Sequence, residues 1–254
     1  MVERTRQSRG VTIVVPAYNE AERLDPKAFL EFAAERDWLH FLFVDDGSRD
    51  GSRDLFARME RESPAQVRTL GFAENQGKAE AVRRGLLLAL EAKPDLVGFW
   101  DADLATPLRE IDGFVSRFDS DPELEMVLGS RVRLLGTEIE RDPARHYLGR
   151  VAATLASAVL GLAVYDTQCG AKLFRVNETL RSIVAEPFLT RWLFDIEILA
   201  RWLRIRAGDR ERVARFIREV PLARWRDVSG SRLKLRDLAR VPLDLWKVHR
   251  KYRG

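Results

Sequence analysis

The sequence predicts an α/β fold in which a mostly parallel, Rossmann-like sheet is flanked by helices. Short runs rich in Val, Ile and Phe alternate with segments whose apolar residues recur every three or four positions, as in repeated βαβ units. Three of these runs end in clusters of polar and acidic residues. With 254 residues, the chain has room for one large domain, placed at residues 1–230, and a basic appendage of amphipathic helices at residues 231–254.

The strand candidates follow one another through the first half of the chain, at residues 11–15, 40–44, 67–70, 96–100 and 125–128. Helical segments separate them. One apolar helical face follows the third strand and another follows the fourth, formed by Ala79, Val82, Leu86, Ala89 and Leu90, and by Leu108, Ile111, Val115 and Phe118. This alternation predicts that consecutive strands run parallel.

The residues that follow the first, second and fourth strands carry the first functional signal. They read Pro16-Ala17-Tyr18-Asn19-Glu20, Asp45-Asp46-Gly47-Ser48 and Asp101-Ala102-Asp103. In an open α/β sheet, ligands bind beyond the carboxyl ends of the strands, so these turns should converge on one crevice. Helix caps and tight turns are the competing explanation for any one of them, but three together favour a binding site.

The chemistry of this edge suits a divalent cation. The chain contains neither a P-loop nor a dinucleotide-binding glycine motif. Asp101 and Asp103 could instead hold Mg²⁺ or Mn²⁺ through carboxylate oxygens and leave coordination positions for diphosphate oxygens. An ion in that position stabilises the charge on a leaving diphosphate.

Further motifs follow the three turns along the chain: Asn75-x-Gly77-Lys78, Gly129-Ser130-Arg131, Asp166-Thr167-Gln168-Cys169-Gly170-x-Lys172-Leu173-Phe174 and Arg191-Trp192-x-Phe194-Asp195-x-Glu197. Taken in order, the motifs resemble those of the GT-A glycosyltransferases of family 2, the nucleotide-diphospho-sugar transferases, over roughly residues 11–234. The later motifs are most similar to the polyprenyl-phosphate branch, and especially to dolichyl-phosphate β-glucosyltransferases.

The resemblance implies a donor site for a nucleotide sugar, UDP-glucose in the first place. Pro16, Tyr18 and Glu20 would line the nucleoside pocket. Asp46 would accept a hydrogen bond from uracil, and Lys78 would lie near the nucleotide. Asp101 and Asp103 would hold the metal and, through it, the diphosphate, which makes Asp103 a catalytic residue.

The resemblance also implies an acceptor site for polyprenyl or dolichyl phosphate. Arg131 would face the acceptor phosphate as a catalytic residue, with Gln168 and Lys172 in the same region, and Asp195 would approach the sugar or the acceptor. Family 2 enzymes invert, so an α-linked donor would give a β-linked product. A phosphomonoester is already an anion near neutral pH and needs no general base, whereas a hydroxyl acceptor would need one, and Asp195 leaves that second case open.

The charge is unevenly distributed along the chain. The formal net charge is +4, but residues 201–254 hold 17 basic and 6 acidic residues, which leaves 26 and 33 in residues 1–200. Such a basic end suits an anionic membrane surface, or else it is a solvated face of helices packed on the body. Pro242 predicts two short helices with a bend in this tail.

A peripheral location at the cytoplasmic face of a membrane is expected. The sequence shows a single cysteine and no signal peptide, and its longest stretch without charge, residues 151–165, is shorter than the roughly 20 residues of a membrane-spanning helix. That small-residue stretch could be an interfacial helix or a buried one. The rival functions are transfer of mannose from a GDP-sugar, transfer to a hydroxyl acceptor and, remotely, nucleic-acid binding, for which no motif is present.

Overall fold

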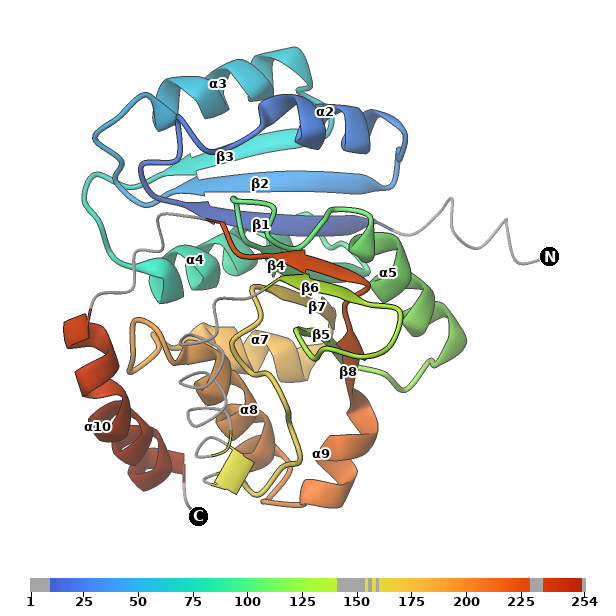
Figure 1. The fold of residues 1–254 in the computed structure, drawn as a ribbon, viewed down its shortest axis with the longest axis vertical. Coiled ribbons are helices and arrows are strands. Elements are labelled where there is room, and N and C mark those ends of the chain that lie inside the picture. Colours follow the sequence, from blue (N-terminus) through green and yellow to red (C-terminus); the bar gives the residue numbers. More distant parts are fainter. Residues whose placement is uncertain (1–9, 141–153, 155–156, 159, 229–234, 253–254) are drawn as a thin grey trace. The chain divides into compact units, whose positions relative to one another are not determined.

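The computed structural model describes residues 10–140, 154, 157–158, 160–228 and 235–252 (Figure 1). The chain divides into two compact units. The first unit comprises Met1–Leu104 with Gly170–Pro187, and the second comprises Ala105–Cys169 with Phe188–Gly254. The family's polar turns and its later motifs thus fall largely into separate units.

The first unit is built on a largely parallel sheet with the strand order β3-β2-β1-β4-β7. The four parallel strands confirm the predicted βαβ pattern, and β7 runs antiparallel to β4. The strands are β1 (Val11–Ala17), β2 (Leu39–Asp45), β3 (Val67–Gly71), β4 (Leu96–Trp100) and β7 (Ala171–Arg175).

Helices cover both faces of this sheet. Right-handed crossovers place α2 (Pro26–Ala34) and α3 (Ser52–Glu62) on one face, and the reversal of strand order between β3 and β4 places α4 (Lys78–Glu91) on the other (Figure 1). A short helix, α7 (Glu178–Ala185), packs beside α4. The apolar face predicted for α4 is buried at all five of its positions, since Ala79, Val82, Leu86, Ala89 and Leu90 lie in the core.

The second unit contains two parallel strand pairs and four helices among its described residues. β5 (Met126–Ser130) pairs with β8 (Ile217–Pro221), and β6 (Glu138–Glu140) pairs with β9 (Arg224–Arg226). The helices are α5 (Glu110–Ser120), α8 (Phe194–Ile205), α9 (Arg210–Phe216) and α10 (Leu235–Tyr252). The apolar face predicted around α5 is buried at Leu108, Ile111, Val115 and Phe118.

The prediction of two short C-terminal helices with a bend is wrong, because α10 is one helix with Pro242 inside it. A proline there removes one backbone hydrogen bond. Packing on α8 offsets that loss: Leu245 and Val248 are buried, and the hydroxyl of Tyr252 donates a 2.7 Å hydrogen bond to Glu197 of α8.

The predicted helix over residues 151–165 falls partly outside the described residues. Where the chain is described beyond Leu160 it is not helical, since Gly161 begins a turn with a φ of 64°. None of the helices in the described part of the chain is both long and apolar enough to cross a bilayer.

Candidate active site

Three turns of the first unit lie at one edge of its sheet. β1 pairs in parallel with β2 on one side and with β4 on the other, so the carboxyl ends of the three strands point the same way. The turns contain Tyr18 and Glu20 after β1, Asp46 after β2, and Asp101 and Asp103 after β4. The structure therefore brings these predicted donor-site residues to a common edge.

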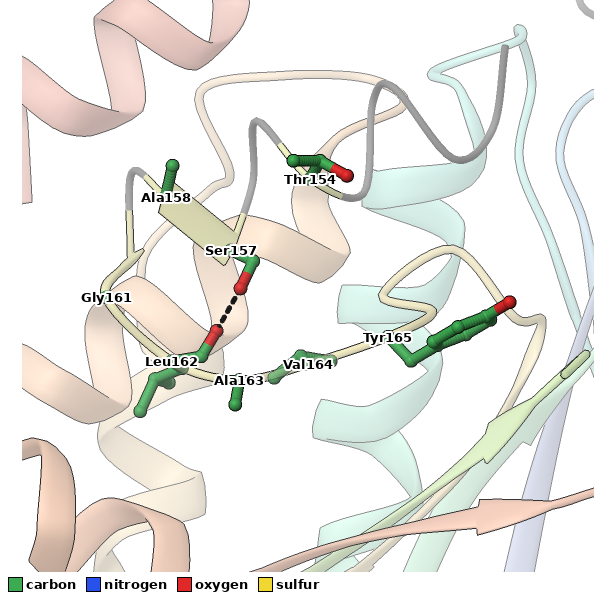
Figure 2. Close-up of a pocket in the computed structure, with 8 residues that line it drawn as sticks. All are labelled: Thr154, Ser157, Ala158, Gly161, Leu162, Ala163, Val164 and Tyr165. Carbon is green, nitrogen blue, oxygen red and sulfur yellow. Dashed lines mark hydrogen bonds between the residues drawn. The ribbon is translucent and has the colours of Figure 1, made fainter. Parts of the chain in front are cut away.

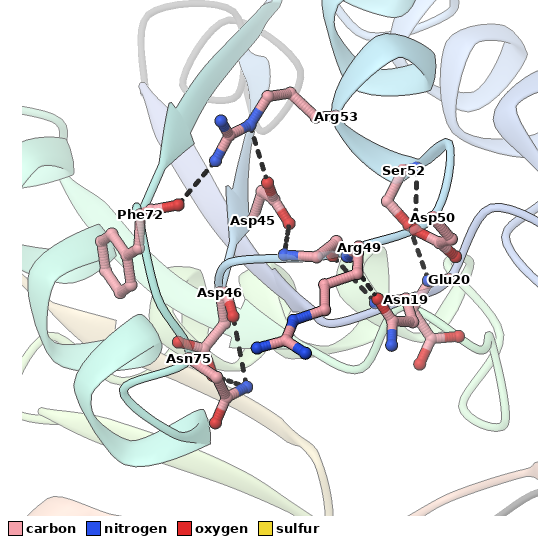
Figure 3. Close-up of polar contacts among 11 residues, drawn as sticks. Asn19, Glu20, Asp45, Asp46, Arg49, Asp50, Ser52, Arg53, Phe72 and Asn75 are labelled. Carbon is pink, nitrogen blue, oxygen red and sulfur yellow. Dashed lines mark hydrogen bonds and ion pairs between the residues drawn. The ribbon is translucent and has the colours of Figure 1, made fainter.

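The turn after β1 is tied to the turn after β2 (Figure 3). Asn19 adopts a left-handed backbone conformation with a φ of 52°, and its backbone N–H donates to Ser48 Oγ at 2.8 Å. The backbone N–H of Arg49 donates to Asn19 Oδ1 at 2.8 Å, and that of Glu20 donates to Ser52 Oγ at 2.7 Å. These bonds fix the backbone that carries Tyr18 and Glu20.

Two further aspartates hold this region together rather than facing a ligand. Asp45 accepts from Nε of Arg53 at 3.1 Å. Asp50 accepts from the backbone N–H groups of Ser52 at 3.0 Å and Ala21 at 3.1 Å. Burial alone would raise the pKa of Asp50, but the hydrogen bonds from Ser52 and Ala21 outweigh it and lower the pKa below its ordinary value. Turn formation, the competing explanation for this motif, therefore accounts for part of it.

Asp46 clamps the loop that leads into α4. Its Oδ2 accepts from Asn75 Nδ2 at 2.8 Å (Figure 3). Its Oδ1 accepts from the backbone N–H of Gln76 at 2.6 Å, and its Oδ2 also accepts from the backbone N–H of Gly77 at 2.8 Å. Gly77 has a φ of 94°, which favours glycine, and Lys78 follows as the first residue of α4. Asp46 thus positions Lys78, while its contact with uracil stays a prediction.

Each carboxylate of the turn after β4 has a basic partner from another element. Lys78 Nζ lies 2.5 Å from Asp101 Oδ1. Arg23, in the turn after β1, places Nη2 3.4 Å from Asp103 Oδ2 and Nη1 3.5 Å from Glu20 Oε1. The carboxylates of this turn therefore attract cationic groups, and in this structure the side chains of Lys78 and Arg23 are those groups.

The residues of this turn fit a divalent cation. Gly170 of the first unit lets the backbone approach Asp101 closely, because a Cβ at that position would lie 1.8 Å from Asp101 Oδ2. In the described part of the chain no group of three or more His, Cys, Asp or Glu side chains could hold a metal. Asp101 and Asp103 offer carboxylate oxygens, which Mg²⁺ and Mn²⁺ accept as ligands, and binding of such an ion there stays a prediction.

The residues expected around the nucleoside flank this edge. Pro16 lies within β1 opposite Val44 and is half-buried, as is Tyr18, whereas Glu20 is buried. Their contact with a nucleoside stays a prediction.

Arg131, which is predicted to face the acceptor phosphate, forms an ion pair with Asp166. Arg131 follows β5, and its Nε and Nη2 donate to Oδ2 and Oδ1 of Asp166, both at 2.7 Å, while its backbone N–H donates to Oδ2 at 3.0 Å. The Arg131 guanidinium also lies 5.4 Å from the ring centroid of Trp225. Such a two-pronged pair holds a guanidinium in one plane, which suits recognition of a second, phosphate anion.

Asp166 is itself held in place by β8. The side chain of Glu219 accepts from the backbone N–H groups of Tyr165 at 2.8 Å and Asp166 at 2.7 Å. Sequence reasoning placed Asp166 within a motif but gave it no role, and it missed Glu219 and Arg23 altogether. A pairing of residues far apart in the chain leaves no periodic signal.

The remaining predicted acceptor residues are divided between the units. Gln168 and Asp195 belong to the second unit, with Asp195 buried in the first turn of α8. Lys172 belongs to the first unit, on β7 opposite Phe99; it is fully buried, and its Nζ lies 5.1 Å from the Phe99 ring centroid. Contact of Gln168 and Lys172 with the acceptor phosphate, and approach of Asp195 to the sugar or the acceptor, stay predictions.

An apolar pocket of about 630 Å³ lies in the second unit, next along the chain to Asp166 (Figure 2). One hydrogen bond crosses it, from Ser157 Oγ to the carbonyl of Leu162 at 2.5 Å. Its surface is mainly apolar. It is lined by Thr154, Ser157, Ala158, Gly161, Leu162, Ala163, Val164 and Tyr165.

A largely parallel α/β sheet with an Asp-x-Asp turn at its carboxyl edge is the arrangement expected of a nucleotide-sugar-dependent glycosyltransferase. The model of the glycosyl transferase family 2 matches residues 12–179, and the chain belongs to that family.

Similar proteins support both the fold and the family. A dolichyl-phosphate beta-glucosyltransferase of Trichomonas vaginalis is 32% identical over 250 residues, which cover 93% of this chain and 70% of the relative. A polyprenol monophosphomannose synthase of Mycolicibacterium smegmatis is 26% identical over 178 residues, covering 70% and 66%. The fold is similar to that of glucosyl-3-phosphoglycerate synthase from Mycobacterium tuberculosis, crystallised with Mn²⁺, UDP-glucose and phosphoglyceric acid, with a TM-score of 0.69, 20% identity, and coverage of 98% of this chain and 82% of that one.

Proposed function

We propose that this glycosyltransferase moves a hexose from a nucleotide sugar to a polyprenyl or dolichyl phosphate, with glucose as the favoured sugar and UDP-glucose as the favoured donor. The observation that carries the proposal is the 32% identity, over nearly the whole chain, to a dolichyl-phosphate beta-glucosyltransferase. The carboxylate turn of the first unit and the anchored Arg131 of the second suit the two substrates.

The first unit would bind the donor. Pro16, Tyr18 and Glu20 would line the nucleoside pocket, and Asp46 would accept a hydrogen bond from the base through the remaining capacity of Oδ1. Lys78, directed toward Asp101 by the Asp46 clamp, would attract the diphosphate.

Asp101 and Asp103 would hold Mg²⁺ or Mn²⁺. Such an ion, when bound, offsets the negative charge that develops on the leaving diphosphate. UDP binding should therefore depend on the divalent cation, and calorimetry should show that Asp103→Ala abolishes this dependence. Tight UDP binding without any divalent cation would contradict the role given to Asp103.

The second unit would position the acceptor phosphate through Arg131 and Gln168, and Lys172 of the first unit would add positive charge. A phosphate oxygen would form a bond to the anomeric carbon as the bond from that carbon to the diphosphate breaks on the opposite side, which inverts the configuration. No proton has to move, because a phosphomonoester is largely ionised near neutral pH. Positioning of the two anions is then the protein's main task.

Asp195 would approach the sugar or the acceptor rather than remove a proton. Asp195→Asn should therefore retain measurable transfer to polyprenyl phosphate, because an asparagine keeps a hydrogen-bonding oxygen but cannot act as a base. A complete loss of turnover with unchanged binding of both substrates would contradict this assignment and favour Asp195 as an obligatory catalytic residue.

The exposed face of α10 would bring the enzyme to an anionic membrane surface at the cytoplasmic face. Leu243 and Trp246 are 52% and 53% exposed, although the opposite side of the same helix is buried. Lys247 and Arg250 are exposed beside them, and the Arg250 guanidinium lies 5.2 Å from the Trp246 ring centroid. Apolar anchors flanked by basic residues suit the interface of a bilayer containing anionic lipids.

Sedimentation with liposomes tests this contact. Trp246→Ser should reduce binding to phosphatidylserine-containing liposomes, and added salt should reduce it further. Leu135→Ser is the matched control, because Leu135 is an exposed apolar side chain that lies outside α10. If liposome binding falls equally in both variants, or in neither, α10 is not the membrane contact.

A donor screen tests the reaction itself. Purified protein with Mn²⁺, polyprenyl phosphate and radiolabelled UDP-glucose should give a lipid-extractable labelled product. GDP-mannose is the necessary second donor, since the polyprenol monophosphomannose synthase covers 70% of this chain. If only GDP-mannose gives a product, GDP-mannose and not UDP-glucose is the donor. If no nucleotide sugar gives a product, the proposal is overturned.

A further inference from the structure

We propose that Glu197 is a positioning residue that couples contact of α10 with a membrane to the geometry of the acceptor side. Its carboxylate joins the C-terminal end of α10 to residues 188–193, the segment that leads into α8 and Asp195. The inference rests on the proposed function, because it takes α10 to meet a bilayer and Asp195 to approach the sugar or the acceptor. Glu197 ends the motif that begins at Arg191, but the proposed function gives it no task of its own.

Both oxygens of the Glu197 side chain accept hydrogen bonds from other parts of the second unit. Oε2 accepts from the backbone N–H of Leu189 at 2.7 Å. Oε1 accepts from the hydroxyl of Tyr252, the last residue of α10, at 2.7 Å and from Nη2 of Arg201 at 2.8 Å. One fully buried carboxylate thus links the end of α10 to a backbone group that precedes α8.

Arg201 completes this cluster. It follows Glu197 by one turn of α8, and its side chain is only 6% exposed. Its Nε donates to the hydroxyl oxygen of Tyr252 at 3.0 Å, and its guanidinium lies 4.6 Å from the ring centroid of Phe188. A buried carboxylate needs an opposite charge and satisfied hydrogen bonds, and Arg201 supplies the charge. The cluster therefore contacts both α10 and the segment before α8.

Residues 188–193 depend on such side-chain bonds, because they form neither a helix nor a strand. A backbone N–H in a segment of this kind has no ladder or helical partner, and that of Leu189 finds its acceptor in Glu197. The side chain of Leu189 is 40% exposed, so burial of this side chain does little to hold the segment. Since α8 begins at Phe194, the bond helps to fix the approach of the chain to Asp195.

Glu197 acts on the acceptor side indirectly. It lies two positions after Asp195 in α8, and residues two apart on a helix point about 200° away from each other. The Glu197 side chain is directed to Tyr252 and is 0% exposed, which leaves no surface for a substrate. Its effect on Asp195 therefore passes through the backbone.

The end of α10 gains from a second support outside the protein. Pro242 interrupts the hydrogen bonds of this 18-residue helix, and Tyr252 lies at its C-terminal end, where helices fray. A bilayer that takes up the exposed side chains of Leu243 and Trp246 would restrain the helix and keep Tyr252 on Glu197. Membrane binding and formation of this hydrogen bond then favour each other, because such a coupling is reciprocal.

Hydrogen–deuterium exchange of the Leu189 amide tests the coupling. Phosphatidylserine-containing liposomes should slow this exchange about twofold or more in the wild type, because the restrained helix keeps the bonds of Glu197 formed. Tyr252→Phe should exchange about two- to fivefold faster without liposomes and should lose the response to them, although it still sediments with them. The Asp166 amide is the internal control: it is held at 2.7 Å by Glu219 of β8, so its exchange should stay at the wild-type rate.

Two further variants separate the contributions of the helix and of the carboxylate. Trp246→Ser should keep the wild-type exchange of the Leu189 amide in solution but lose the response to liposomes, because it removes only the membrane side of the coupling. Glu197→Gln keeps one accepting oxygen for three donors and should also lose the response.

Transfer kinetics give a second readout. With polyprenyl phosphate in the same liposomes, Tyr252→Phe should raise the KM for the acceptor about two- to threefold and leave the KM for UDP-glucose unchanged. A merely structural role of the tyrosine would change both constants and would speed exchange at the Asp166 amide as well.

The outcomes distinguish the coupling from the proposed function. Equal exchange of the Leu189 amide with and without bound liposomes would overturn the coupling alone, as would a liposome response that persists in Tyr252→Phe. A wild type that does not sediment with the liposomes would overturn the membrane contact of α10 together with the coupling. A normal exchange response without any lipid-linked product would overturn the proposed acceptor and support the link between α10 and residues 188–193.

Discussion

Replacing Asp166 by asparagine should destabilise the second unit and loosen the arginine that we assign to the acceptor phosphate. Asp166 receives three hydrogen bonds from Arg131, at 2.7, 2.7 and 3.0 Å. The side chains of Arg131 and Asp166 are only 17% and 8% exposed. The substitution removes the negative charge and one of the two accepting oxygens while it keeps the shape of the side chain.

The cost follows from what asparagine can still do. A hydrogen bond to a charged group contributes about 1.5–3 kcal/mol, and asparagine retains one acceptor that can serve the Arg131 backbone N–H. Breaking a fully buried ion pair by removing one partner costs about 3–5 kcal/mol, and partial exposure of Arg131 places this pair at the lower end. The free energy of unfolding should therefore fall by about 3 kcal/mol, with a coupling to Arg131→Gln of about 2 kcal/mol.

Urea unfolding of the wild type, both single variants and the double variant measures that coupling. Arg226 and Glu140 form the control cycle in the same unit, because their 3.0 Å ion pair is 80% and 70% exposed and should couple by less than about 0.5 kcal/mol. Binding of inorganic phosphate to the acceptor site should weaken in Asp166→Asn while UDP binding is preserved. A coupling as small as that of the control pair would refute the positioning role of Asp166.

Three further substitutions probe the donor side and the C-terminal helix. Asp46→Asn should weaken UDP binding about tenfold, because a lost acceptor releases the loop before α4, and unchanged calorimetry would contradict the clamp. Gly170→Ala should reduce Mn²⁺-dependent UDP binding, since its methyl group would have to displace the side chain of Asp101; wild-type affinity would exclude this close approach. Burial and the hydrogen bond to Glu197 raise the pKa of Tyr252 to about 12. The neutral Tyr252 hydroxyl therefore makes its full contribution to the free energy of unfolding below the unfolded pKa near 10, and this contribution is lost as the pH rises through 12. The wild type should thus exceed Tyr252→Phe by about 1 kcal/mol at pH 8, after allowance for solvent screening, with the gap closing between about pH 10 and 12 in urea unfolding; a constant gap would argue against the tyrosine hydrogen bond.

The parallel part of the first unit could be predicted because its central strands β1, β2 and β4 are largely buried and mostly apolar. The observed bounds differ from the predicted ones by at most two residues at these strands and at the more exposed β3. By contrast, β7 was not predicted as a strand: it is short, ends in a charged residue, and contains the buried Lys172. It pairs with β4 across more than 70 residues of chain, which no local pattern reveals.

The candidate site likewise contains residues that could be predicted from the sequence and residues that could not. Residue types that chemistry requires, such as Asp101 and Asp103, can be read from the sequence because they follow a strand directly. The groups that hold them cannot, since Arg23 reaches Asp103 across 80 positions and Glu219 reaches Asp166 across 53. The continuity of α10 through Pro242 could not be predicted either, because it depends on packing against α8, which overrides the helix-breaking tendency of the proline.

We assign a lipid phosphate as the acceptor. Two matched acceptors test this assignment: polyprenyl phosphate and the polyprenol of the same length, each incubated with wild-type protein, Mn²⁺ and labelled UDP-glucose. A labelled lipid product is expected from the phosphate only, with a raised KM for polyprenyl phosphate in Arg131→Gln. Product from the polyprenol, or an Arg131→Gln variant with unaltered KM and kcat, would contradict it.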